Sequence, residues 1–239
     1  MRSLHIHLFQ TLRITTADGQ LLDLGSPTTK SLFAYLVLHR GAPLDRRRLA
    51  FLFWPRGTEA AARRNLRQYL HRIRRALEPV DPNGRFLHTA GHNVRLTPPP
   101  DFYLDVAAFE AACTPPNEAL ETAVSLYTGD LLEDVYDDWV TPERERLAAL
   151  YREALTRLID RCEQAGQPRQ AIRYAEQFLA AEPLLEHAHV RLMQLYYAVG
   201  DRGRVTQQYE LLTTTLAEEL GADPLPETTA TYEAMLAAH

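Results

Sequence analysis

The pattern of apolar and polar positions changes its period along the chain. In the first hundred residues, three short segments alternate apolar and polar side chains and predict strands: residues 4–9, 12–15 and 21–24. The period then becomes helical over residues 28–39, which we expect to form a first helix. Residues 45–53 predict a second, shorter helix, with Asp45 as its N-cap and with Pro55 and Gly57 after its end.

A third helix is predicted over residues 59–77, where neither Gly nor Pro interrupts the pattern and Thr58 can cap the N-terminus. Its apolar side chains recur every three or four residues and so share one face: Ala62, Leu66, Tyr69, Leu70, Ile73 and Leu77. Residues 85–89 and 94–96 then predict two strands joined by a turn at residues 90–93. Three helices followed by such a hairpin are in the order expected of a winged helix.

From residue 105 onward the helical period dominates, and we expect helices at residues 105–112, 117–127, 142–165, 168–181, 185–199, 202–220 and 226–237. A repeat with a period of 34 residues pairs Gly166 with Gly200, Ala171 with Val205, and Phe178 with Leu212. This period resembles that of tetratricopeptide repeats, in which stacked helix pairs share one core. The predicted fold class is therefore a two-domain protein. An α+β winged helix-turn-helix over residues 1–100 is followed by an all-α tetratricopeptide-like helical stack over residues 101–239.

The net charge of −5 conceals an uneven distribution of charge. Residues 1–100 hold 16 Lys and Arg against 6 Asp and Glu, a balance of +10. Residues 101–239 hold 10 against 25, a balance of −15. A basic domain suits a polyanion and an acidic domain does not, so the two domains are expected to have different partners.

The basic side chains concentrate on the third helix, on the face opposite its apolar stripe and on its flanks. Arg and Gln can each make two hydrogen bonds to a base edge in the major groove of double-stranded DNA, and further Arg can bind phosphates. No acidic residue lies between positions 60 and 77, so we expect these arginines to lack ion-pair partners at i,i+4. The candidate DNA-binding residues are Arg63, Arg64, Arg67, Gln68, His71, Arg74 and Arg75 of this helix, Lys30 of the first helix, and Arg85, His92 and Arg95 of the hairpin.

The sequence argues against an enzyme. It contains no phosphate loop, nucleophile elbow or Gly-rich dinucleotide turn, so we predict no catalytic residue and no cofactor. The nine histidines offer no second ligand pair at workable spacing, so no metal site is predicted. No apolar run approaches the roughly 18 residues that a membrane span needs, and the N-terminus lacks a signal-peptide pattern. We therefore expect a cytoplasmic protein, with Cys113 and Cys162 as buried thiols.

A series of short motifs carries a family resemblance. In the first half they are Thr29-Lys30-Ser31-Leu32, Leu52-Phe53-Trp54-Pro55, Asn65-Leu66-Arg67 and Ile73-Arg74-Arg75-Ala76-Leu77. In the second half they include Leu104-Asp105-Val106, Leu126-Tyr127-Thr128-Gly129-Asp130-Leu131-Leu132, Trp139-Val140 and Glu218-Glu219-Leu220-Gly221-Ala222-Asp223-Pro224. Their order and spacing, over about residues 4 to 236, resemble the Streptomyces antibiotic regulatory protein (SARP) family. That family joins an OmpR-like winged helix to a bacterial transcriptional activator domain.

The resemblance implies an activator that recruits RNA polymerase. The third helix would enter the major groove, and two protomers would lie head-to-tail on directly repeated half-sites. The loop over residues 54–58, with Arg56 exposed, would face RNA polymerase or its sigma factor. One departure lies in the hairpin, where Asn93-Val94 replaces the Gly-Tyr that is usual in the family. Because Asn tolerates the left-handed conformation, we expect the turn to survive, whereas a stacking contact from the missing aromatic ring would be lost.

The alternative hypothesis is a protein-interaction adaptor that uses the helical stack, with a winged helix that no longer reads DNA. Fold alone does not separate the two, because winged helices also bind proteins. The cationic face of the third helix favours DNA, since an adaptor has no need of it. The sequence does not indicate the operator, the target genes or the activating signal.

Overall fold

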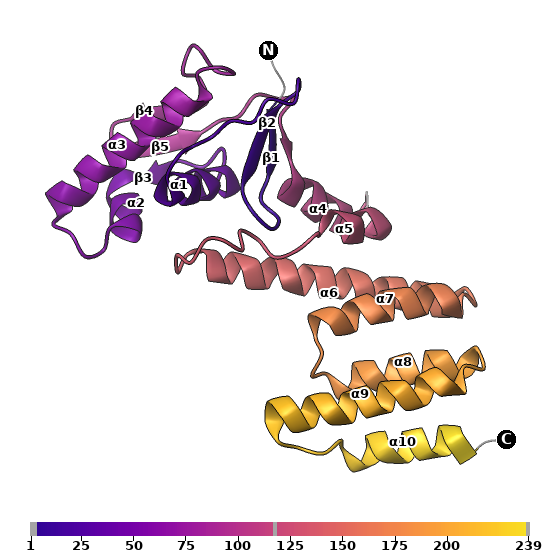
Figure 1. Cartoon of the computed structure of the whole chain (residues 1–239). Helices are drawn as coiled ribbons and strands as arrows, with labels where there is room; N and C mark the ends of the chain where they lie inside the picture. The colour runs from indigo at the N-terminus through magenta and orange to yellow at the C-terminus, as the bar shows by residue number, and fades with distance from the viewer. Residues whose placement is uncertain (1–3, 117–118, 238–239) are drawn as a thin grey trace. The chain divides into compact units, whose positions relative to one another are not determined.

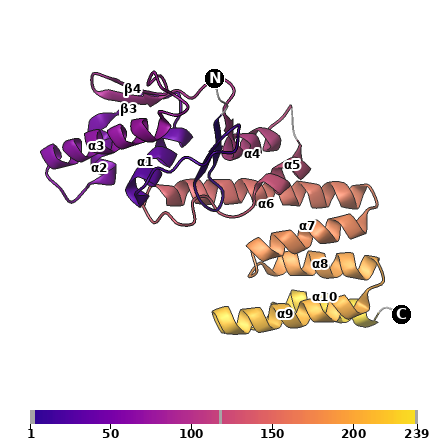
Figure 2. The ribbon, with the colours of Figure 1, turned by 45° about the horizontal axis from the view of Figure 1, so that its top comes forward.

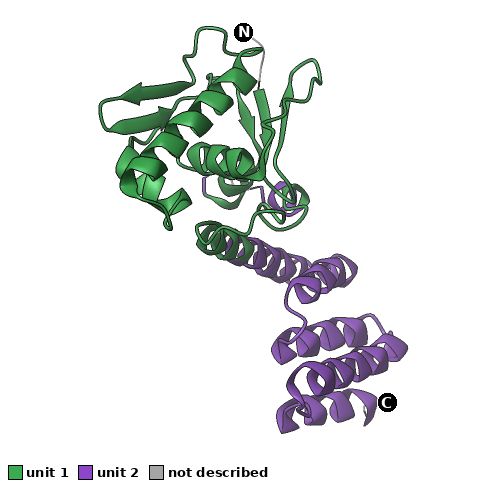
Figure 3. Ribbon diagram, turned by 60° about the vertical axis from the view of Figure 1, so that its left-hand side comes forward, with its two compact units in different colours: residues 1–114, 125–148 green, residues 115–124, 149–239 purple. Residues whose placement is uncertain are grey.

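The computed structural model describes residues 4–116 and 119–237, which form two compact units (Figures 1 and 3). The first unit comprises residues 1–114 and 125–148, and the second comprises residues 115–124 and 149–239. The first unit extends beyond residue 100 because segments that follow it pack on the N-terminal sheet and helices. The predicted boundary between a winged-helix domain and a helical domain, at residues 100 and 101, stays a prediction.

The first unit contains a small sheet with the strand order β2-β1-β6. Strand β1 (Leu4–His7) pairs antiparallel with β2 (Arg13–Thr16) and parallel with β6 (Tyr103–Leu104), a pairing that the sequence analysis did not predict. The expected strand at residues 21–24 is wrong, because only an isolated bridge joins Leu21 to Thr15. The side chain of Asp23 accepts a hydrogen bond from the Gly25 N–H, and this local turn takes the place of a continued ladder.

Three helices and a second sheet follow in the predicted order. The helices are α1 (Pro27–Leu38), α2 (Arg46–Phe53) and α3 (Glu59–Leu77), and the sheet has the order β3-β5-β4, with β3 (Leu44–Asp45), β4 (Leu87–Ala90) and β5 (Asn93–Leu96). The turn between β4 and β5 places Gly91 at φ 57°, whereas Asn93 belongs to β5 and has no positive φ. The expectation that Asn93 occupies a left-handed position is therefore wrong.

Segments after residue 100 complete the first unit. Helix α4 (Asp105–Cys113) begins at Asp105. The carboxylate of Asp105 accepts hydrogen bonds from the N–H groups of Leu8, Phe9 and Val106, at 2.7–3.1 Å. Before α6 (Val140–Gln164), the indole of Trp139 donates to the Ser31 hydroxyl at 3.1 Å. These contacts explain why the compact unit continues past the Pro-rich segment at residues 97–100.

The second unit is a succession of helices. It holds most of α5 (Leu120–Leu126), the C-terminal part of α6, and then α7 (Pro168–Ala181), α8 (Glu186–Ala198), α9 (Arg202–Leu220) and α10 (Pro226–Ala237). Figure 2 shows α7, α8 and α9 following one another along the unit. The helix predicted at residues 117–127 begins at Leu120, and positions 117 and 118 lie outside the described residues.

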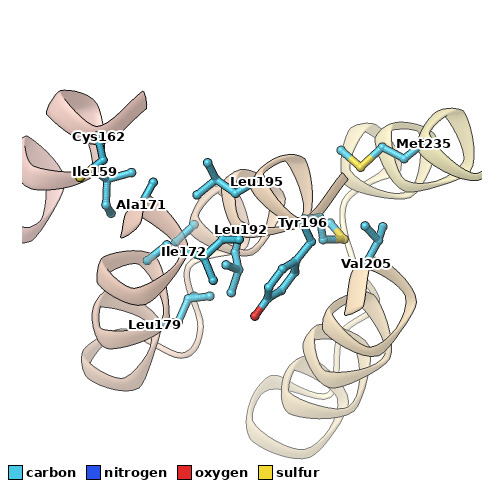
Figure 4. Packing of buried hydrophobic residues seen from close by; sticks show 13 residues of the cluster. Ile159, Cys162, Ala171, Ile172, Leu179, Leu192, Leu195, Tyr196, Val205 and Met235 are labelled. Carbon is cyan, nitrogen blue, oxygen red and sulfur yellow. The ribbon is translucent and has the colours of Figure 1, made fainter. Parts of the chain in front are cut away.

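The repeat of 34 residues has a physical basis in the second unit. Gly166 and Gly200 both adopt a positive φ, 66° and 79°, after the ends of α6 and α8. Ala171 and Val205 are both fully buried in the cluster that joins α6 to α10 (Figure 4). Residues at equivalent positions of the repeat therefore have the same structural role in successive helix pairs. The prediction of buried thiols is confirmed, because the side chains of Cys113 and Cys162 are both buried and neither forms a disulfide.

Candidate nucleic-acid interface

Helix α3 has one buried face and one exposed face. The Thr58 hydroxyl accepts a hydrogen bond from the Ala61 N–H at 3.3 Å, which caps the N-terminus as predicted. The apolar side chains at helical spacing are buried: Ala62, Leu66, Leu70, Ile73 and Leu77. Tyr69 is half-buried at the edge of the stripe, where its ring packs against Trp54 with centroids 5.2 Å apart. The apolar face thus fixes the rotation of α3 and determines which side chains face the solvent.

The opposite face of α3 is cationic and exposed. Arg64, Gln68, His71 and Arg75 are all exposed, as the helical spacing predicts. Arg63, Arg67 and Arg72 are exposed as well, and the Arg72 guanidinium lies 4.8 Å from the centre of the Tyr69 ring. In the described ranges, 4–116 and 119–237, no carboxylate lies at ion-pair distance from the side chains of Arg64, Arg67 or Arg75.

One arginine of α3 is paired, which corrects the expectation that none has a partner at i,i+4. Glu59 lies in the first turn, one position before the interval that lacks acidic residues, and its carboxylate is 2.6 Å from the Arg63 guanidinium. The same carboxylate is 3.0 Å from the Arg47 side chain of α2. Glu59 therefore neutralises part of the charge at the N-terminal end of α3 and none beyond it.

A second arginine of α3 is engaged by the hairpin. The Arg74 guanidinium donates to the Leu87 carbonyl oxygen at 3.4 Å and to the Thr89 hydroxyl at 3.0 Å. Arg74 is half-buried by these contacts. It therefore holds β4 against α3, and any contact of Arg74 with DNA would compete with this structural role.

A cleft lies between α2, α3 and the tip of the hairpin. It has a volume of about 480 Å³ and is lined by Asp45, Arg46, Arg47, Arg63, Leu66, Arg67, Gly91 and His92. The Arg46 N–H donates to the His92 carbonyl oxygen at 2.8 Å, which joins the start of α2 to the turn. The Arg48 N–H, with that of Arg47, holds the pKa of the Asp45 carboxyl below its ordinary value. Four arginines and one aspartate line the cleft, and two of these arginines, Arg47 and Arg63, also contact the Glu59 carboxylate.

The cleft contains two residues that the sequence analysis missed, Arg46 and Arg47. The run Arg46-Arg47-Arg48 was visible in the sequence, but nothing in its spacing showed that the start of α2 lies beside the hairpin turn. The missing information is the pairing of β3 with β5, which brings these two elements together. Guanidinium groups bind phosphate and carboxylate oxygens through paired hydrogen bonds, so this set of arginines suits an anion such as a phosphate.

The other predicted residues lie away from this cleft. Arg95 is exposed on β5 and lines a separate hollow beside His88. Arg85 is exposed before β4, and Lys30 is half-buried on α1. Arg56 is exposed in the loop after α2, as expected, and lines neither the cleft nor the hollow. The structure thus brings Arg63, Arg67 and His92 together and leaves these four residues apart.

The described residues include neither a membrane-spanning helix nor a cluster of metal-ligating side chains. Each helix there is too short or too polar to cross a lipid bilayer. The described part of the chain also contains no group of three or more His, Cys, Asp or Glu side chains that could hold a metal ion.

Comparison with known proteins gives one family match and several relatives. The bacterial transcriptional activator domain family matches residues 105–236. The regulatory protein AfsR of Streptomyces coelicolor is 27% identical over 87% of this chain, and the match covers 22% of AfsR. The transcriptional regulatory protein MoaR1 of Mycobacterium tuberculosis is 27% identical over 91% of this chain and 75% of MoaR1. The chain therefore spans about a fifth of the length of AfsR.

A solved structure has a similar fold. It is Mycobacterium tuberculosis EmbR in complex with a low-affinity phosphopeptide, and it superposes with a TM-score of 0.75 at 25% identity. The match covers 99% of this chain and 65% of that chain. The likeness therefore extends over both compact units.

These matches place the chain in the class of transcriptional regulators, and they agree with the prediction that it is not an enzyme. The chain belongs to the bacterial transcriptional activator domain family, and the resemblance to the SARP family is confirmed.

Proposed function

We propose that this chain is a sequence-specific DNA-binding regulator whose first unit uses a winged helix. The observation that carries the proposal is the exposed cationic face of α3, where Arg64, Arg67 and Arg75 have no ion-pair partner among the described residues. An α-helix fits the major groove of B-DNA, and these side chains can reach base edges and phosphates. In this arrangement the β4–β5 hairpin acts as the wing.

We further propose distinct roles for the residues of the first unit. Arg64 and Gln68, in the middle of the exposed face, read base edges, and His71 and Arg75 extend the same surface. The cleft with Arg63, Arg67 and His92 holds a backbone phosphate, while Lys30, Arg85 and Arg95 add contacts that carry no sequence information. Arg74 supports the position of the wing and contributes charge at the edge of the surface.

The description of the matching family, bacterial transcriptional activator domain, supports a role in activating transcription. In this proposal the loop with Arg56 faces RNA polymerase or its sigma factor, and two protomers bind direct repeats roughly 10–11 bp apart, on one side of the duplex. The second unit, a tetratricopeptide-like stack, braces the regulator and offers protein contacts. A regulator of this kind acts on the chromosome, so its place would be the bacterial cytoplasm.

A gel-shift titration across salt concentrations tests the proposal. If 6–10 phosphates are neutralised, the affinity for a promoter fragment should fall by roughly 10³–10⁵ between about 50 and 200 mM salt. Arg169→Ala, an exposed arginine of α7 in the second unit, serves as a matched control and should leave the titration unchanged. A flat response to salt, or no binding to any fragment, would favour the protein-interaction adaptor instead.

A further inference from the structure

The loop before α6 presents an exposed aromatic side chain in the first unit. Tyr136 is 91% exposed, whereas Val135 and Trp139 on either side of it are 8% and 9% exposed. Exposing a large aromatic ring to water costs free energy, and the chain's own core does not bury the ring of Tyr136. The loop therefore projects Tyr136 outward from a buried base.

The backbone of this loop is held by the side chain of Arg144. The Arg144 guanidinium donates to three carbonyl oxygens, those of Leu131 at 2.9 Å, Leu132 at 2.7 Å and Val135 at 3.2 Å. The Ser31 hydroxyl donates to the carboxylate of Asp137 on the far side of the tyrosine. Because the backbone is already fixed, seating Tyr136 in a partner would cost little conformational entropy.

The surroundings of Tyr136 are acidic. Glu133, Asp134, Asp137 and Asp138 are all exposed, and no Lys or Arg occurs between residues 128 and 143. The nearest cation in sequence, Arg144, is engaged by the loop carbonyls. We call residues 133–138 the acidic loop. It presents one aromatic ring surrounded by negative charge.

A groove of opposite character lies elsewhere in the same unit, between α2 and the start of α3. Its volume is about 500 Å³, and its lining includes Ala50, Phe51, Trp54, Gly57 and Ala62. Phe51 is 69% exposed, so the groove offers an aromatic surface to an incoming ring. We call this the aromatic groove.

The rim of the aromatic groove is cationic. Arg47 and Arg48 lie along it, and Glu59 is the acidic residue in its lining. The Glu59 carboxylate is shared between Arg47 and Arg63, at 3.0 and 2.6 Å. Within the part of the chain that the structure describes, no carboxylate lies at ion-pair distance from the Arg48 side chain. The rim therefore keeps an excess of positive charge.

We propose that the acidic loop of one copy of this chain docks in the aromatic groove of a second copy, with Tyr136 against Phe51 and Trp54. The acidic residues would then face Arg47 and Arg48, so the two surfaces match in both apolar character and charge. Both surfaces belong to the first unit (Figure 3), and no residue of the acidic loop lines the aromatic groove. The contact is therefore heterologous, in which one patch of each copy binds the other patch of its neighbour. It does not require DNA.

Sedimentation of the full chain without DNA tests this contact. We expect association that depends on protein concentration and weakens as salt is raised, because exposed charges at the rim are screened. Tyr136→Ala and Phe51→Ala should each weaken association at least tenfold, since a central aromatic contact contributes most to such an interface. Tyr197→Ala, an exposed tyrosine in the second unit, is the matched control and should change nothing. A chain that stays monomeric at about 100 μM would overturn the proposal.

Two designs separate this contact from other modes of self-association. Asp134→Arg and Arg48→Glu should each weaken association, because each places two like charges at the contact. A mixture of the two variants should recover association, because the native loop of one meets the native groove of the other and the two reversed charges also attract each other. A mixture of Tyr136→Ala with Phe51→Ala should likewise associate, since one carries an intact groove and the other an intact loop. If neither mixture associates more strongly than its separate components, the loop and the groove are not partners. Recovery in both mixtures supports the proposal.

Discussion

Arg64 and Arg95 are both exposed arginines of the first unit, but they lie on different elements. Arg64 belongs to the face of α3 opposite the buried stripe, and Arg95 lies on β5 beside His88. A helix in the major groove brings Arg64 to base edges, whereas a wing reaches the backbone or the minor groove. Two residues of the same type are thus expected to have different roles.

Alanine substitutions separate these roles. Arg64→Ala or Gln68→Ala should relax sequence preference, with a loss of about 1–3 kcal/mol in discrimination at the base pair concerned. Arg95→Ala should weaken binding to all duplexes by a similar factor, because only a phosphate contact is lost. Fluorescence anisotropy on a set of single-base variants of one duplex measures both effects. If Arg64→Ala weakens every duplex equally, the orientation of α3 inferred here is wrong.

His189 gives the second unit a dependence on pH. Its Nε2 donates to the Pro183 carbonyl oxygen at 2.9 Å, so Nδ1 is the acceptor of the Gln208 amide at 2.6 Å. The residue is 2% exposed, and burial lowers the pKa of its imidazole below 6.5. The unfolded chain takes up a proton near pH 6.5 and the folded chain does not. The contribution of the neutral His189 to the free energy of unfolding is therefore fully present above that pH and is lost progressively as the pH falls below it.

We expect the free energy of unfolding to fall through His189 as the pH is lowered from 7.5 to 5.5, by at most about 1.4 kcal/mol for each unit by which folding lowers its pKa. Urea titrations of the wild type and of His189→Gln at both pH values measure this, because the difference removes the contribution of the other titrating groups. His187→Gln, an exposed neighbour, is the control and should keep the wild-type dependence. A His189→Gln variant with the same pH dependence as the wild type would contradict the assignment.

At the scale of elements, the glycines after α6 and α8 end the helices in left-handed conformations. Gly166 and Gly200 have φ values of 66° and 79°, and each has open space where a Cβ would lie. The cost of a side chain there is backbone strain rather than a clash. Gly203, in the first turn of α9, has no such φ.

Gly166→Ala and Gly200→Ala should each lower the free energy of unfolding by about 1–2 kcal/mol. Gly203→Ala should be neutral or stabilising, since Ala is the better helix former. Chemical denaturation of the three variants gives the comparison. Equal effects at Gly200 and Gly203 would show that the left-handed conformation is not what requires glycine.

Helices with a clear period and end signals could be predicted well from the sequence. The predicted bounds of α3, α7, α9 and α10 agree with the structure. Strands β3 and β6 could not be predicted, because two residues carry no alternation and their partners are distant in sequence. The same limit applies to the candidate site. The exposed face of α3 follows from its period, whereas the cleft with Arg46 and Arg47 depends on the pairing of β3 with β5.

At the scale of the whole molecule, the change from basic to acidic sequence does not coincide with the boundary of the first compact unit. The sequence changes from basic to acidic near residue 100, but the first compact unit continues through α4 and the acidic loop. Asp105 and Trp139 make this continuation possible, since both bond to segments near the N-terminus. A unit that carries both a cationic helix and an acidic loop can bind DNA through the helix and protein through the loop.

The central claim is that α3 reads double-stranded DNA, and selection of bound duplexes from a random pool tests it most directly. The full chain should enrich a defined motif, and Arg64→Ala combined with Gln68→Ala should lose or alter that motif while keeping affinity for DNA in general. Directly repeated copies of the motif roughly 10–11 bp apart would match the proposed arrangement of protomers. Enrichment of no motif, or of the same motif by the double variant, would contradict the account.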